Sequence, residues 1–84
     1  MDKVLIVTGG SRGIGAATAR IASRRGYAVC VNFLKNKAAA TQIADKINAD
    51  GGHAIAIGAD ISKEEEVLEL FSTVDDRLGK ISAL

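Results

Sequence analysis

Hydrophobic and polar residues divide the chain into short apolar runs and longer segments with helical spacing. The first run, at residues 4–7 (VLIV), contains four apolar residues without a polar one between them. Such a run is typical of a strand that is covered on both faces in a parallel sheet. Similar runs at 27–33, 53–59 and 81–84 predict three more strands, of which the chain only begins the last.

Three segments between these runs carry apolar residues three and four positions apart, as on one face of a helix. We expect the first helix directly after a glycine-rich loop, the second at about 37–50, and the third between Ser62 and Gly79. The predicted buried stripes are Ile14, Ala17, Ile21 and Ala22 in the first helix, Ala40, Ile43, Ala44 and Ile47 in the second, and Val67, Leu70, Phe71, Val74 and Leu78 in the third.

Short signals mark the ends of these helices. Asn36 is the expected N-cap of the second helix, and Ser62 with Glu65 forms the S-x-x-E pattern of a capping box before the third. A glycine that takes positive φ commonly follows the last turn of a helix. We expect this role for Gly26, Gly51 and Gly79.

The order βαβαβαβ predicts an α/β fold, namely the first half of a Rossmann-type doubly wound parallel sheet with strand order 3-2-1-4. Right-handed crossovers place the first two helices on one face and the third on the other. Because the third helix covers its face almost alone, we expect residues of the first two strands to be open to water there. This predicts that residues 1–84 are the N-terminal part of a single domain whose remainder is absent.

Composition narrows the class of protein. The chain is 48% hydrophobic and has a net charge of +1, so charge gives no reason to expect binding to nucleic acid or to a membrane. There is no run of 18 apolar residues, and the first strand begins too early to leave room for a signal peptide. The single cysteine, Cys30, excludes a disulfide within the chain and favours the reducing cytoplasm.

The glycine-rich loop between the first strand and the first helix has a specific spacing. Gly10 and Gly15 are separated as in a phosphate-binding P-loop, but alanines stand where that motif needs Lys and Ser/Thr. The G-x-G-x-x-G pattern fails as well, because Thr18 occupies its last position. The pattern that fits is T-G-x-x-x-G-x-G from Thr8 to Gly15. Since the amino end of a helix attracts phosphate, the loop predicts a phosphate site; the alternative is a tight turn without a ligand.

This stretch resembles the dinucleotide loop of the short-chain dehydrogenase/reductase family, and the likeness covers all 84 residues, about the first third of that family's usual chain. The resemblance implies an NAD(P)-binding domain, in the branch of 3-oxoacyl-carrier-protein reductases and sugar dehydrogenases. The residues expected to contact the cofactor are Gly9, Ser11, Arg12, Gly13, Ile14, Gly15, Asn32, Phe33, Lys35, Asp60 and Ile61.

The end of the second strand selects the cofactor in that family, where an acidic residue favours NAD. The equivalent position here is Phe33, flanked by Asn32 and Leu34, so no carboxylate is available. Arg12 and Lys35 could instead pair with the 2′-phosphate, which predicts NADP. The alternative is that both cations are ordinary solvated loop residues.

Asp60 follows the third strand directly, and the resemblance implies that it accepts a hydrogen bond from the adenine amino group while Ile61 packs beside the ring. The alternative is an aspartate that only orders its own turn. His53 has no partner motif, Cys30 is an expected core thiol, and the carboxylates of the third helix show no metal-binding spacing.

The resemblance implies that the parent protein transfers a hydride between nicotinamide and a carbonyl or secondary alcohol and forms a homo-oligomer, commonly a tetramer. The family's catalytic serine and Tyr-x-x-x-Lys pair would lie beyond Leu84, and Tyr27 cannot replace them. We therefore expect no catalytic residue and no metal in this piece. Two alternatives are an NADP(H) sensor without turnover and an interaction module without a ligand.

Overall fold

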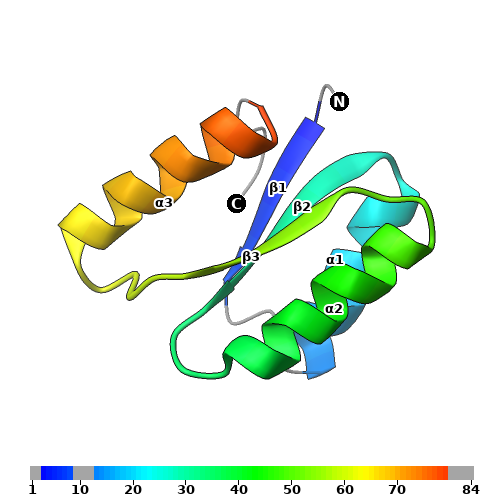
Figure 1. Cartoon of the computed structure of the whole chain (residues 1–84), viewed down its shortest axis with the longest axis horizontal. Helices are drawn as coiled ribbons and strands as arrows, with labels where there is room; N and C mark the ends of the chain where they lie inside the picture. The colour runs from blue at the N-terminus through cyan, green and yellow to red at the C-terminus, as the bar shows by residue number, and fades with distance from the viewer. Residues whose placement is uncertain (1–2, 9–12, 80–84) are drawn as a thin grey trace.

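The computed structural model describes residues 3–8 and 13–79, with Ile14 described by its backbone alone. Strands and helices alternate along the chain (Figure 1). They are β1 (Lys3–Thr8), α1 (Gly13–Arg24), β2 (Tyr27–Phe33), α2 (Lys37–Ala49), β3 (Ala54–Gly58) and α3 (Glu64–Arg77). These bounds confirm the predicted elements up to the third helix. The expected fourth strand at 81–84 lies outside the described residues.

The three strands form one parallel sheet in the order β1-β2-β3. Ile6 of β1 is the register partner of Cys30 in β2, which in turn is the partner of Ile55 in β3. This is the α/β arrangement that the alternation of elements predicts. The full order 3-2-1-4 remains a prediction, because it needs the fourth strand.

The helices lie in two layers, with α1 and α2 on one face of the sheet and α3 on the other (Figure 1). Successive residues of a strand point to opposite faces, and β2 follows this rule: Val29 and Val31 belong to the core with α1 and α2, whereas Ala28 and Cys30 belong to the core with α3. Small residues dominate the contributions of α1 and α2 to their core: Ala19, Ala22, Ala40 and Ala44. Leu70 and Val74 are the fully buried residues of α3.

The expectation that the α3 face would be open to water at the first two strands is wrong. Val4, Ile6, Ala28 and Cys30 are at most 1% exposed. They share one core with Leu70 and Val74, so α3 shields these residues of β1 and β2 from water. The partly buried strand residues packed against this core come from β3, where Ile55 and Ile57 retain some exposure.

The predicted buried stripe of α1 is wrong at Ile21, which is 52% exposed. Ala19 and Ala22 are the residues that α1 buries, and these short side chains let the helix backbone approach the sheet closely. Ile21 lies at the flank of that contact, in a wide hollow that Leu5 and Tyr27 also line. Ala17 is half-buried, and the side chain of Ile14 lies outside the described part of the structure.

The helix ends confirm most of the predicted signals. Gly26 and Gly51 have φ of 93° and 90°, and Gly79 follows α3 with φ 107°. The Asn36 side chain accepts a hydrogen bond of 3.1 Å from the Ala39 amide, as an N-cap does. The capping box is wrong, because α3 starts at Glu64 and its N-cap is Lys63, whose side chain makes no capping hydrogen bond. The Ser62 hydroxyl instead donates a hydrogen bond to the carboxylate of Asp60.

Candidate functional site

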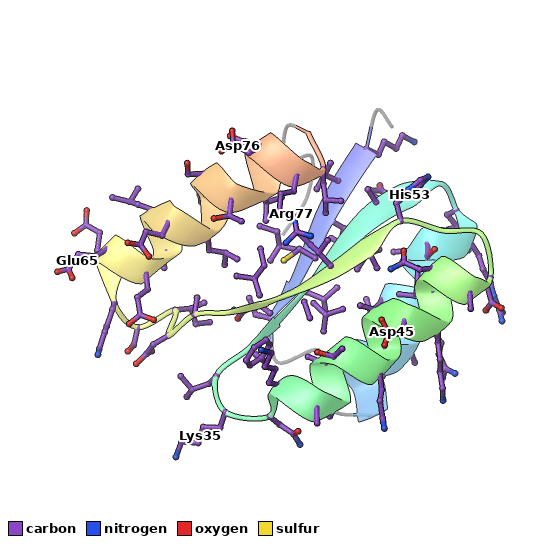
Figure 2. The ribbon with its side chains drawn as sticks, in the orientation of Figure 1. Lys35, Asp45, His53, Glu65, Asp76 and Arg77 are labelled. Carbon is purple, nitrogen blue, oxygen red and sulfur yellow. The ribbon has the colours of Figure 1, made fainter. Side chains whose placement is uncertain are left out.

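The carboxyl ends of the three strands meet at one edge of the sheet, because the strands are parallel. In open α/β sheets this edge is where ligands bind. The loop after β2 and the loop after β3 both lie there, with Lys35 at its rim (Figure 2). Eight of the eleven predicted contact residues are at least partly described, and the fold brings them to this edge.

The amino end of α1 is the first part of the candidate site. Gly13 is the first residue of the helix and is exposed, and a Cβ built on it would meet nothing within 4 Å. The first turn holds no acidic residue, so no side-chain charge there opposes an anion. This open helix end fits a phosphate. Gly9, Ser11 and Arg12 lie outside the described residues, so their predicted contacts stay predictions.

Asn32, near the end of β2, has a role that the sequence reasoning missed. The residue is 3% exposed, and its Nδ2 donates to the carbonyl oxygens of Ile57 at 3.2 Å and Ala59 at 3.3 Å. The amide therefore joins the end of β2 to β3 and to the loop that follows. The available signal was a polar residue inside an otherwise apolar strand. A cofactor contact from Asn32 would have to use groups other than Nδ2.

Phe33 closes β2 and packs against the core that α1 and α2 share. Its ring lies over Gly58, where a Cβ would come within 2.9 Å of ring atoms Cε2 and Cζ. The two residues that follow, Leu34 and Lys35, are exposed. The end of β2 therefore presents an aromatic ring, an apolar side chain and a cation, and no carboxylate.

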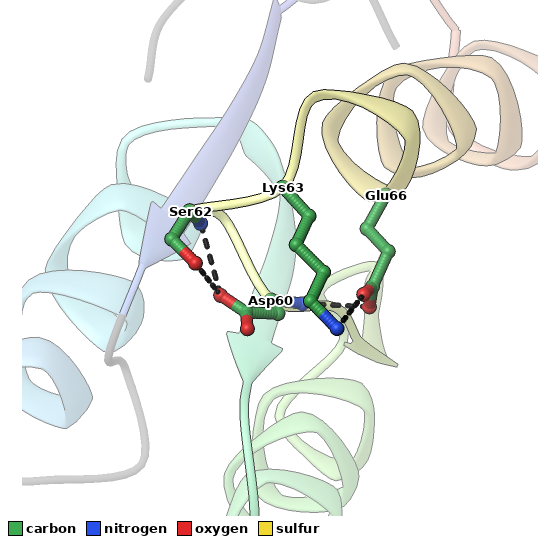
Figure 3. A network of polar contacts seen from close by, with 4 residues as sticks. All are labelled: Asp60, Ser62, Lys63 and Glu66. Carbon is green, nitrogen blue, oxygen red and sulfur yellow. Dashed lines mark hydrogen bonds and ion pairs between the residues drawn. The ribbon is translucent and has the colours of Figure 1, made fainter.

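Asp60 lies at the centre of a compact polar network after β3, together with Ser62, Lys63 and Glu66 (Figure 3). Its Oδ1 accepts hydrogen bonds from the Ser62 amide at 2.9 Å and the Ser62 hydroxyl at 2.6 Å. Its own amide donates to Oε1 of Glu66 at 2.9 Å, and Lys63 Nζ lies 3.7 Å from Oε2 of Glu66. The Ser62 hydrogen bonds lower the pKa of Asp60, because they stabilise its ionised form. The alternative of a turn-ordering aspartate is thus correct for Oδ1.

Ile61 is 52% exposed beside Asp60, and Leu34 is 62% exposed after β2. Exposed aliphatic side chains of this size are available to pack against a flat ring. The predicted contact of Ile61 with the adenine ring stays a prediction.

Other candidate groups lie away from this edge. Cys30 is buried, and desolvation raises its pKa to about 12 even though the charge of Arg77 acts in the opposite direction. His53 lies before β3, at the far edge of the sheet, where its carbonyl accepts from the Val29 amide (Figure 2). Tyr27 begins β2 at the same far edge, with Lys3 Nζ 5.6 Å from its ring centre. Among the described residues, no group of three or more His, Cys, Asp or Glu could hold a metal ion.

In the described part of the chain, no helix combines the length and the apolar content that crossing a membrane requires.

Comparison with known proteins identifies relatives that are about three times as long. The uncharacterized oxidoreductase YgfF of Escherichia coli is 42% identical over 81 residues, which make up 96% of this chain and 33% of YgfF. The 3-oxoacyl-[acyl-carrier-protein] reductase of Synechocystis is 40% identical over 82 residues, or 98% of this chain and 33% of that protein. A crystal structure of a hydroxysteroid dehydrogenase from Escherichia coli superposes with a TM-score of 0.91 and 35% identity, covering 99% of this chain and 35% of that one.

The family match agrees with the geometry of the sheet edge. The model of the family described as short chain dehydrogenase matches residues 3–84, which include every element of the fold. The open amino end of α1 fits the phosphates of a dinucleotide. This chain belongs to the short-chain dehydrogenase family, whose members are oxidoreductases that bind NAD or NADP.

Proposed function

We propose that this chain is the cofactor-binding part of an NADP-dependent short-chain dehydrogenase/reductase. The observation that carries the proposal is the lack of an acidic side chain at the end of β2, where the residues are Phe33, Leu34 and Lys35. An acidic side chain at this place would repel a 2′-phosphate, and the exposed ammonium of Lys35 attracts one. NADP is therefore the cofactor whose charge this edge complements.

The proposed contacts divide by the parts of the cofactor. The amino end of α1 and the backbone of Gly9, Ser11, Gly13, Ile14 and Gly15 would hold the pyrophosphate. Arg12 and Lys35 hold the 2′-phosphate, and a hydrogen bond from such a cation contributes about 1.5–3 kcal/mol. Phe33 borders the ribose, and Asn32 fixes the strand end that carries it. Asp60 and Ile61 hold the adenine.

The reaction of the whole protein is a hydride transfer between the nicotinamide and a small carbonyl compound or secondary alcohol. The nicotinamide supplies the hydride or accepts it. Within these 84 residues the only tyrosine is Tyr27, and it begins β2 at the edge of the sheet opposite the proposed cofactor site. General acid–base chemistry thus requires the serine and Tyr-x-x-x-Lys of a longer chain, and the residues described here bind and orient.

The relatives favour an enzyme over a sensor, since they carry the names of oxidoreductases and reductases. We also propose a cytoplasmic location, which the buried, unpaired thiol of Cys30 supports. For the whole protein we propose a homo-oligomer, without nucleic-acid or membrane partners.

The proposal is tested by calorimetric titration of the intact protein with NADPH and with NADH. We expect NADPH to bind roughly ten- to a hundredfold more tightly, as one charge-assisted hydrogen bond provides. Arg12→Ala and Lys35→Ala should weaken NADPH far more than NADH, whereas Lys46→Ala, on exposed α2, should change neither. Equal affinity for the two cofactors in the unmodified protein would overturn the assignment to NADP.

A further inference from the structure

We propose that Ser62 is a positioning residue for recognition of the purine base: it holds the Asp60 carboxylate so that one oxygen faces an exocyclic amino group. This makes the site selective for a 6-amino purine over a 6-oxo purine. The inference rests on the proposed function, in which Asp60 contacts the adenine of the cofactor.

The contacts to the carboxylate are one-sided. In the described part of the chain, both hydrogen bonds that the Asp60 carboxylate accepts fall on Oδ1. The Ser62 hydroxyl bond, at 2.6 Å, is short, as charge-assisted O–H···O⁻ bonds are. The two bonds hold one carboxylate oxygen in the turn, so the other oxygen, Oδ2, is the one that the proposal assigns to the ligand.

The main chain on both sides of this carboxylate is held as well (Figure 3). The Asp60 amide donates to Glu66 at 2.9 Å, and the Asp60 carbonyl accepts from the Lys63 amide at 3.0 Å. On the preceding residue, the Ala59 amide donates to the Phe33 carbonyl at 3.0 Å. Asp60 thus sits on a backbone that β2 and α3 fix, and Ser62 sets the one remaining freedom, the orientation of its side chain.

The charge of the carboxylate sets which base it accepts. The Ser62 bonds and the nearby charge of Lys63 lower the pKa of Asp60, so the group is ionised and can only accept hydrogen bonds. The 6-amino group of adenine donates, whereas the 6-oxo group of hypoxanthine is itself an acceptor. A rigid, ionised Asp60 therefore favours adenine, and a carboxylate that has lost the Ser62 hydroxyl bond and keeps only the amide bond is less firmly oriented and loses part of that preference.

The test measures dissociation constants of the intact protein for NADPH and for its hypoxanthine analogue, the reduced nicotinamide hypoxanthine dinucleotide phosphate. Ser62→Ala removes the hydroxyl bond and should lower the preference for NADPH by roughly three- to tenfold, the range that one hydrogen bond supplies. Ser62→Thr keeps a hydroxyl and should restore the preference. Ser72→Ala, an exposed serine of α3, is the matched control and should behave as the unmodified protein.

A pH profile separates positioning from a merely structural effect. Without the Ser62 hydroxyl, the pKa of Asp60 rises toward its ordinary value, so the loss of NADPH affinity on acidification should begin at a higher pH in Ser62→Ala. An unchanged base preference and an unchanged pH profile in Ser62→Ala would overturn the inference. Asp60→Ala tests the underlying proposal independently: if this variant binds both dinucleotides as the unmodified protein does, Asp60 does not contact the base and the proposed site itself fails.

Discussion

Replacing Asn32 by aspartate exchanges the side-chain NH2 group, a hydrogen-bond donor, for a carboxylate oxygen, which only accepts hydrogen bonds when ionised. In the structure, Asn32 Nδ2 donates to two carbonyl oxygens, those of Ile57 and Ala59. An aspartate at this place would set a carboxylate oxygen against those two acceptors, at a position only 3% exposed. We therefore expect Asn32→Asp to be among the most destabilising single substitutions in β2.

The magnitude follows from the two hydrogen bonds and from the buried charge. Each neutral hydrogen bond contributes a net of about 0.5–1.5 kcal/mol, so Asn32→Leu, which loses both without adding a charge, should cost about 1–3 kcal/mol. An uncompensated buried charge costs about 3–5 kcal/mol, so Asn32→Asp should cost more than Asn32→Leu at pH 7. The difference between the two variants isolates the effect of charge from the loss of the donors.

The dependence on pH has a definite sign. Burial and the two carbonyl oxygens raise the folded-state pKa of the introduced carboxylate above its unfolded value of about 3.9. The penalty is therefore complete above the folded pKa and disappears as the pH falls to the unfolded value. Asn32→Asp should approach the stability of Asn32→Leu near pH 4.

Urea unfolding followed by circular dichroism at pH 7 and pH 4 measures these differences. With a slope of about 1 kcal/mol per molar urea, as small domains show, Asn32→Leu should move the midpoint by about 1–3 M. Gln42→Glu on the exposed face of α2 is the control for an added carboxylate and should leave the midpoint nearly unchanged. A midpoint for Asn32→Asp at pH 7 equal to that of the unmodified protein would refute the assigned role of Asn32.

Two further predictions concern packing and ionisation. Gly52→Ala should cost about 1–3 kcal/mol in urea unfolding, because a Cβ there would collide with Ser23 Oγ and Ile47 Cγ2. An unchanged stability of Gly52→Ala would contradict the close approach of Gly52 to these two side chains. Burial raises the Cys30 pKa from 9.0 to about 12, so the free energy of unfolding should fall above pH 9.0, by up to about 1.4 kcal/mol per pH unit. Cys30→Ala should lose this part of the slope, and equal slopes would show that the thiol is not protected.

Local signals in the sequence predicted local structure well. Asn36 caps α2 as expected, since its partner, the Ala39 amide, lies three residues away. Apolar runs located the strands, because strands covered on both faces leave little place for polar residues. The carboxyl edge of the sheet and the lack of a carboxylate after β2 followed from the order of the elements and from the residues themselves.

What the sequence could not predict depends on competition between partners and on distant contacts. Ser62 fits a capping box, but its hydroxyl donates to the Asp60 carboxylate two residues before it, and α3 begins only at Glu64, with Lys63 as its N-cap. The partners of Asn32 lie 25 and 27 residues further along the chain, so no local pattern reveals them. Ile21 fits a helical stripe, yet the exact rotation of α1 depends on how closely Ala19 and Ala22 approach the sheet.

The most direct test of the cofactor site is a titration of the intact, ¹⁵N-labelled protein with NADPH, followed by the amide signals of its backbone. We expect the largest shifts at Gly13 and Gly15 of α1 and at Asp60 after β3. The amide signals of Gly51 and His53, at the opposite edge of the sheet, should not shift. Shifts confined to that opposite edge, or no shifts at all, would contradict a dinucleotide site at the carboxyl ends of the strands.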